Sequence, residues 1–168
     1  MRKCLVEIAR TANGYLVRVE GHATLKQSPA LSRFVAQALA DCPQTTIAID
    51  VRPCLYMDST FLGCLLTSQR TLIKSGAQFT VIVDEDARQR LLAKTRLDSV
   101  LRLVPSAPDS IGAFVTLTAQ QPAEIEFGQH IVDSHLALAE LPGTHSHVFR
   151  DIADQLTREL QARRPGCI

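Results

Sequence analysis

The sequence lacks a strong net charge and a long apolar run, and each absence excludes a class of protein. A formal charge of +1 over 168 residues leaves no overall electrostatic footprint for a nucleic acid or a membrane surface, so neither is expected as a partner. No apolar stretch approaches the ~20 residues that a membrane span needs. Charge returns as early as Glu7, which interrupts any signal-peptide core. We therefore expect a soluble, cytoplasmic protein.

The sequence also lacks paired cysteines. Five cysteines are present, and none belongs to a CxxC motif. Cys4, Cys54 and Cys64 stand in apolar surroundings, which is typical of small buried hydrophobes in a reducing compartment.

Histidines offer the other route to a metal site. His145 and His147 lie two residues apart in the segment GTHSH, after His130 and His135. Solvated loop histidines are commoner than ligands, and no convincing third or fourth ligand accompanies these. We expect neither a metal nor a cofactor.

Strand-like and helix-like segments alternate over the first hundred residues. Asn13-Gly14 separates β-rich runs at 4–9 and 15–20, which predicts an antiparallel hairpin. The apolar run at 46–51 predicts a strand covered on both faces, and residues 78–84 are expected as the next strand. Helices are expected from Ser28, as the cap before Pro29, to Asp41, over 60–74, and over 85–94. This order predicts an α/β fold with a mixed, mostly parallel sheet and helices packed on it.

Pro105 and Pro108 indicate a boundary, so we divide the chain into residues 1–105 and a mainly helical extension, residues 106–168. Residues 109–120 are ambiguous between strand and helix. Helices are expected over 125–141 and 144–163, joined as a hairpin through Pro142-Gly143.

The last expected helix carries a narrow apolar stripe with a spacing of four residues. The stripe consists of Val148, Ile152, Leu156 and Leu160. It requires a cover, either the 125–141 helix or a second chain. Phe149, Ile131 and Leu138 remain as further apolar surface, so we expect the hairpin to pack again. A dimer contact is favoured over docking on the sheet's own helices.

The segment YMDSTFLG, residues 56–63, lies where a buried strand gives way to a helix. Asp58 is suited to cap that helix, with Ser59 and Thr60 as its first residues. A phosphoryl group on Ser59 would be tolerated there, because a helix N-terminus favours negative charge. Asp-Ser-Thr is also ordinary capping chemistry. No GxSxG motif surrounds Ser59 and no sequence feature brings a histidine to it, so hydrolase chemistry is not expected.

The stretch IAIDVRPCLYMDSTFLGCLLTSQRTLIKSGAQFTVIV resembles the centre of a STAS domain. In bacterial anti-sigma factor antagonists of that family, a strand leads into a D-S-[ST]-G-L-G corner and then a helix. The resemblance extends from about residue 4 to 104 and includes QRLLAKTRLDSVLRL as the closing segment. It places the family's phosphorylated hydroxyl on Ser59. Phe61 stands where the family usually has Gly, and its ring is expected either to fill part of the docking surface or to anchor a different partner.

The resemblance implies a non-enzymatic binding switch. The expected partner is an ATP-binding anti-sigma factor that is also a serine kinase. A PP2C-type phosphatase would remove the phosphate again. Phosphorylation of Ser59, with Thr60 as a secondary acceptor, would release the partner. The docking surface is expected to comprise the exposed face of the 60–74 helix and the corner residues Met57, Asp58, Ser59, Thr60, Phe61 and Leu62.

The alternative is a constitutive scaffold or assembly subunit. In that interpretation the STAS-like fold is a structural platform, and the C-terminal helices form a homodimer. Phe61 and the long extension favour this alternative, whereas the intact Asp58-Ser59 pair favours the switch.

Overall fold

The computed structural model describes residues 3–143 and 145–163. A seven-stranded sheet has the order β6-β5-β3-β2-β1-β7, and β4 pairs with β2 away from this path. The strands are β1 (Leu5–Thr11), β2 (Gly14–Ala23), β3 (Thr46–Asp50), β4 (Cys54–Met57), β5 (Gln78–Ile82), β6 (Leu103–Val104) and β7 (Ile111–Thr116).

Parallel pairs dominate the sheet, as the alternation of elements predicts. β2 pairs in parallel with β3 and β4, β3 with β5, and β5 with β6. The antiparallel pairs are β1–β2, which is the predicted hairpin at Asn13-Gly14, and β1–β7. The ambiguous segment 109–120 therefore supplies an edge strand.

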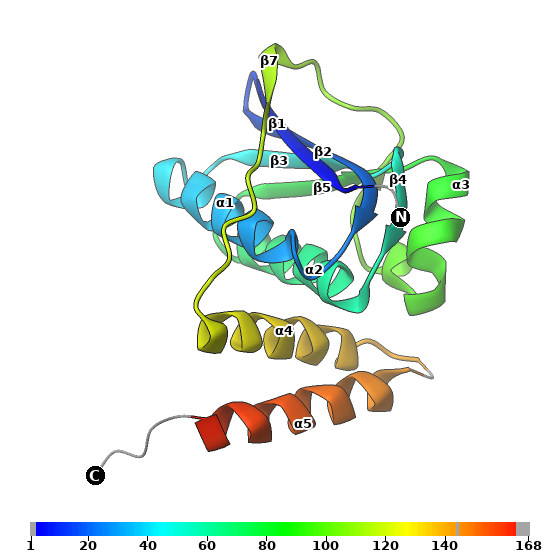
Figure 1. Cartoon of the computed structure of the whole chain (residues 1–168). Helices are drawn as coiled ribbons and strands as arrows, with labels where there is room; N and C mark the ends of the chain where they lie inside the picture. Colours follow the sequence, from blue (N-terminus) through cyan, green and yellow to red (C-terminus); the bar gives the residue numbers. More distant parts are fainter. Residues whose placement is uncertain (1–2, 144, 164–168) are drawn as a thin grey trace.

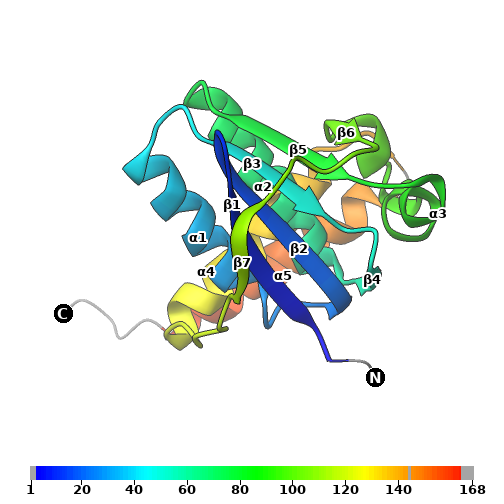
Figure 2. The ribbon, with the colours of Figure 1, turned by 90° about the horizontal axis from the view of Figure 1, so that it is seen from above.

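The helices form layers beneath one face of the sheet. They are α1 (Ser28–Asp41), α2 (Ser59–Lys74), α4 (Glu124–Ala139) and α5 (Ser146–Arg163). α1 and α2 pack on the sheet, α4 lies beyond α2, and α5 lies beyond α4 (Figure 1). Seen from above, the helices lie behind the strands, and α1 extends beyond the edge of the sheet (Figure 2). Among the described residues, no helix combines the length and apolar character needed to cross a bilayer.

The main core fills the space between the sheet and α1 and α2. Its largest fully buried side chains include Phe61, Phe79, Leu31, Ile49 and Leu65. On the opposite face of the sheet, a smaller cluster of Leu16, Ala48 and Ile82 is covered by residues including Ala107 and Phe114. Both faces of the central strands are thus covered, as the apolar run at 46–51 indicates for β3.

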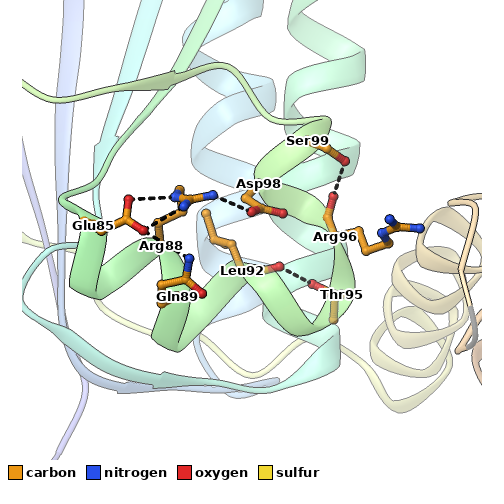
Figure 3. A network of polar contacts seen from close by, with 8 residues as sticks. All are labelled: Glu85, Arg88, Gln89, Leu92, Thr95, Arg96, Asp98 and Ser99. Atoms are coloured by element: carbon orange, nitrogen blue, oxygen red, sulfur yellow. Dashed lines mark hydrogen bonds and ion pairs between the residues drawn. The ribbon is translucent and has the colours of Figure 1, made fainter.

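The segment after β5 turns away from the sheet through a short helix, α3 (Glu85–Ala87), a π-helical turn (Arg88–Leu92) and two 3-10 turns (Ala93–Thr95 and Leu97–Ser99). Asp84 caps α3 by accepting a hydrogen bond from the Ala87 amide. The Arg88 guanidinium donates to both Glu85 and Asp98 and so ties the first turn to the last (Figure 3). Hydrogen bonds from Arg88 lower the pKa of Glu85 to about 2.

Three details of the secondary structure differ from the expected fold. The segment expected as one helix over 85–94 is α-helical only over Glu85–Ala87 and continues as π-helical and 3-10 turns. The strand that enters the corner is β4, a four-residue element, and not the 46–51 run. Ser28 is the first residue of α1 and not its side-chain cap. The N-cap is Gln27, without a side-chain capping bond, and Ser28 is fully buried. Its hydroxyl donates to the Leu25 carbonyl oxygen, so it faces inward.

The apolar stripe of α5 is also only half buried. Leu160 is buried and Leu156 is partly buried against α4, together with Ala153. Val148 and Ile152 remain 42% and 36% exposed. A spacing of four residues drifts by about 40° per step on a helix of 3.6 residues per turn, so the first half of the stripe rotates away from α4.

The hairpin of α4 and α5 packs on α2 of the same chain. Ala137, Leu138 and Leu141 belong to the same core cluster as the side chains of α2. Docking on the sheet's own helices, which the sequence disfavoured relative to a dimer contact, is therefore present.

Candidate functional site

The corner between β4 and α2 is organised by Asp58. One carboxylate oxygen of Asp58 accepts a hydrogen bond of 2.9 Å from the Phe61 amide, which caps α2 as predicted. The other oxygen accepts a bond of 2.7 Å from the Leu25 amide in the loop before α1. The Asp58 amide donates to the Ala23 carbonyl oxygen at the end of β2. The amide and the carboxylate of Asp58 together fix the start of α2 relative to β2 and to the loop before α1.

Ser59 is the first residue of α2 and is partly buried. Its hydroxyl lies 3.0 Å from Nε2 of His135 on α4. Nδ1 of His135 lies 2.8 Å from the Ile131 carbonyl oxygen. A carbonyl oxygen can only accept, so Nδ1 carries a proton, and in the neutral imidazole Nε2 accepts the Ser59 hydroxyl proton. No feature of the sequence indicated a histidine at Ser59, and the fold brings His135 to it.

A second serine–histidine contact joins α4 to the start of α1. Nε2 of His130 lies 2.8 Å from the hydroxyl oxygen of Ser28. Since Ser28 donates its proton to Leu25, His130 is the donor in this contact. Burial lowers the pKa of His130, Arg33 lowers it further, and Asp133 opposes the shift. Both histidines of α4 therefore meet a serine at a helix N-terminus.

The remaining predicted corner residues are buried. Met57, Thr60 and Leu62 have exposed fractions of 7%, 3% and 5%, and Phe61 has none. The Phe61 ring belongs to the main core, because Phe61 lies two positions, about 200°, around the helix from Ser59. Phe61 therefore neither fills nor extends an exposed docking surface, which corrects both expectations for it.

The face of α2 that carries Ser59, Gly63, Thr67 and Arg70 is called the outer face here. α4 lies against it, so the predicted exposed face of the 60–74 helix is covered in this chain. A Cβ atom added to Gly63 would lie 2.3 Å from the Ser134 carbonyl oxygen, which shows that the two backbones touch at this point. Arg70 closes the far end with an ion pair of 2.6 Å to Glu140.

Exposed apolar surface next to the corner comes from β4. Leu55 and Tyr56 are 42% and 50% exposed, and the Tyr56 ring lies 5.7 Å from that of His22. Neither residue was predicted as part of the site. The apolar Leu-Tyr pair directly before Met57 could have indicated this surface. It was missed because β4 was not recognised as a strand.

Among the described residues, the cysteines and the other histidines form no metal-binding cluster. Cys54 and Cys64 are buried, and burial raises the pKa of Cys64 to about 12, as expected for apolar thiols. Within residues 3–143 and 145–163, no group of three or more His, Cys, Asp or Glu side chains could hold a metal ion.

Comparisons with known proteins agree with the fold of the first hundred residues. Residues 6–105 match the protein family described as "Mlab, STAS domain". The fold resembles that of an anti-sigma factor antagonist from Mycobacterium paratuberculosis, known from its crystal structure, with a TM-score of 0.52 and 24% sequence identity. That match covers 62% of this chain and 87% of the other. No curated protein sequence matches the chain.

Proposed function

Because the chain belongs to the STAS domain family, we propose that it is a non-enzymatic regulatory binding protein. Its Ser59 corner docks a protein partner, and phosphorylation of Ser59 switches that contact. The observation that carries the proposal is the placement of Ser59 as the first residue of a capped helix, partly exposed. The likeness in fold to an anti-sigma factor antagonist supports a role of the same kind.

A phosphate on Ser59 suits this position chemically. It adds about −1.5 to −2 charges at neutral pH, and the amides at the N-terminus of α2 offset part of that charge. The fold of α2 therefore tolerates the modification. The hydroxyl, however, no longer offers a proton to a docked acceptor, and a charged group must be hydrated. Modification thus acts on whatever packs over Ser59, while the sheet stays intact.

The partner proposed for the corner is an ATP-binding anti-sigma factor that also acts as a serine kinase, with a PP2C-type phosphatase restoring the hydroxyl. Leu55 and Tyr56 extend the contact surface, because both are exposed directly before the corner. Thr60 is buried, so the secondary acceptor role needs the first turn of α2 to open.

Affinity capture from the source cells tests this proposal. Wild type and the control variant Ser106→Asp, altered at an exposed position, are expected to retain an ATP-binding anti-sigma kinase. The amount of kinase captured by Ser59→Asp is expected to be at least tenfold lower. Mass spectrometry of the native chain should find phosphate on Ser59. Equal capture by Ser59→Asp, or a chain without phosphate on Ser59 under all growth conditions, contradicts the switch.

One observation favours a second candidate, constitutive assembly through the C-terminal helices. Val148 and Ile152 leave apolar surface on α5, which the equivalent helix of a second copy could cover. Sedimentation of wild type and of Val148→Asp at high micromolar concentration tests this candidate. A wild-type dimer that becomes monomeric in the variant supports it, and a monomeric wild type contradicts it.

A further inference from the structure

The outer face of α2 already holds a helix. At Gly63 the backbone of α4 comes so close that a Cβ atom would be 2.3 Å from the Ser134 carbonyl oxygen and 2.7 Å from the Ser134 Cβ atom. Such an approach needs glycine on one helix and a small residue on the other. Ser134 is 1% exposed, so the contact leaves no space for a larger side chain.

Directional contacts flank this close approach. On one side, the Ser59 hydroxyl pairs with His135. On the other, Arg70 pairs with Glu140. Between them, Ala137 and Leu138 of α4 join the main core. The outer face therefore selects a helix with a small residue at the crossing, apolar residues after it, and a hydrogen-bonding side chain over Ser59.

The connection to α4 allows this helix to leave. β7 ends at Thr116, and α4 begins at Glu124. The residues between them have no regular structure, and Thr118, Ala119, Gln120 and Gln121 are exposed. The pairing of β7 with β1 ends with a hydrogen bond from the Leu117 amide to the Val6 carbonyl oxygen. The rest of the connection lies beyond that bond, so the hairpin can detach without removing a strand.

We infer that the outer face of α2 is a helix-docking surface, which α4 occupies within the chain and for which a helix of the protein partner competes. The inference rests on the proposed function for the existence of that partner and adds its kind: an α-helix with a small residue at Gly63 and a hydrogen-bonding side chain at Ser59. The hairpin is then an internal substitute for the partner helix and lowers the partner's apparent affinity.

The test uses the full chain and a fluorescein-labelled peptide of residues 121–163, which is the hairpin itself. Ser134→Leu places a large side chain at the crossing and should release the internal hairpin while leaving the α2 surface unchanged. Fluorescence anisotropy is expected to show at least tenfold tighter peptide binding to Ser134→Leu than to wild type. His135→Ala, a milder change, is expected to lie between the two.

Hydrogen exchange of the same proteins shows whether the hairpin is released in each variant. Residues 124–163 should exchange at least tenfold faster in Ser134→Leu, with β3 and β5 unchanged. If β3 and β5 also lose protection, the comparison of His135→Ala with wild type decides. A released hairpin without tighter peptide binding overturns the inference, as does a hairpin that stays protected in both variants.

Two double variants locate the binding and separate it from the proposed switch. Gly63→Leu combined with Ser134→Leu fills the surface itself, and peptide binding that survives there overturns the inference. Ser59→Asp combined with Ser134→Leu should weaken peptide binding at least tenfold. Peptide binding that is insensitive to Ser59→Asp contradicts the proposed charge switch. It still supports the inference that the outer face of α2 docks a helix.

Discussion

The two faces of α2 differ in kind. The inner face presents Phe61, Leu65 and Leu72, all without exposed surface, to the core beneath the sheet. The outer face presents Ser59, Gly63 and Arg70, whose contacts with α4 and with Glu140 after it are a hydrogen bond, a backbone approach and an exposed ion pair. Ala137 and Leu138 add an apolar contact beside them. Large apolar contacts are costly to expose, whereas polar contacts can be exchanged for water or another helix. One helix therefore combines a permanent interface with an exchangeable one.

The largest effect should come from the inner face. Leu65→Ala removes a fully buried side chain and should lower the free energy of unfolding by about 2–5 kcal/mol. Urea denaturation measures this loss, with strands and hairpin unfolding together. Ile73→Ala on the same helix, at a side chain that is 58% exposed, is the control and should change stability by less than about 0.5 kcal/mol. Similar losses in both variants would erase the distinction between the faces.

The outer face should respond locally. In Gly63→Ala the new Cβ atom collides with the Ser134 carbonyl oxygen, and overpacking of this kind costs about 1–3 kcal/mol. Hydrogen exchange should therefore accelerate about tenfold or more over 124–163 and stay unchanged in β3 and β5. Gly143→Ala is the matched control, since its Cβ atom would meet only Arg96 Cδ at an ordinary 3.5 Å. Acceleration that is uniform over strands and hairpin would show that the two faces unfold together.

A smaller effect should depend on pH. Burial holds the pKa of His130 in the folded chain below its unfolded value of about 6.5. In the window between these values the unfolded chain binds more protons, so stability falls as the pH drops below about 6.5. Urea unfolding at pH 7.5 and 5.5 should show that the free energy of unfolding falls less in His130→Asn than in wild type. In His145→Asn, at an exposed histidine, it should fall as much as in wild type. An equally steep decline in His130→Asn would remove His130 as the source.

The smallest effect is expected at Arg70. Its ion pair with Glu140 is exposed, with side-chain exposures of 37% and 58%, and such pairs contribute about 0–1 kcal/mol. Arg70→Gln should leave hairpin exchange within a few fold of wild type, and added salt should reduce even that difference. Release of the hairpin comparable to that in Gly63→Ala would place the main contact at this end instead.

Much of the sheet and of the start of α2 was predictable, because these features depend on local sequence patterns. The Asn13-Gly14 turn, the apolar runs of β3 and β5, and the Asp58 cap each depend on neighbouring residues. β4 was not predicted because it has only four residues, and its two central residues, Leu55 and Tyr56, are exposed. A strand this short and half-solvated carries no periodic signal.

The outer face was not predictable from local patterns. Ser59 and His135 are 76 positions apart, and nothing near either residue indicates the other. One signal was available in Gly63, since a glycine inside a helix destabilises it by roughly 0.5–1 kcal/mol relative to alanine and often indicates a close approach. The resemblance only matched Gly63 to the last position of the family's corner motif, whereas in this chain the backbone of α4 packs against it.

Site-specific phosphoserine at position 59 of the full chain, followed by hydrogen exchange of the hairpin, tests most directly whether Ser59 controls the outer face of α2. The phosphate lacks the proton that His135 Nε2 accepts from the hydroxyl and must be hydrated. Residues 124–163 should therefore exchange at least tenfold faster than in the unmodified chain, with β3 and β5 unchanged. A hairpin that stays equally or better protected would show that charge on Ser59 does not control this face.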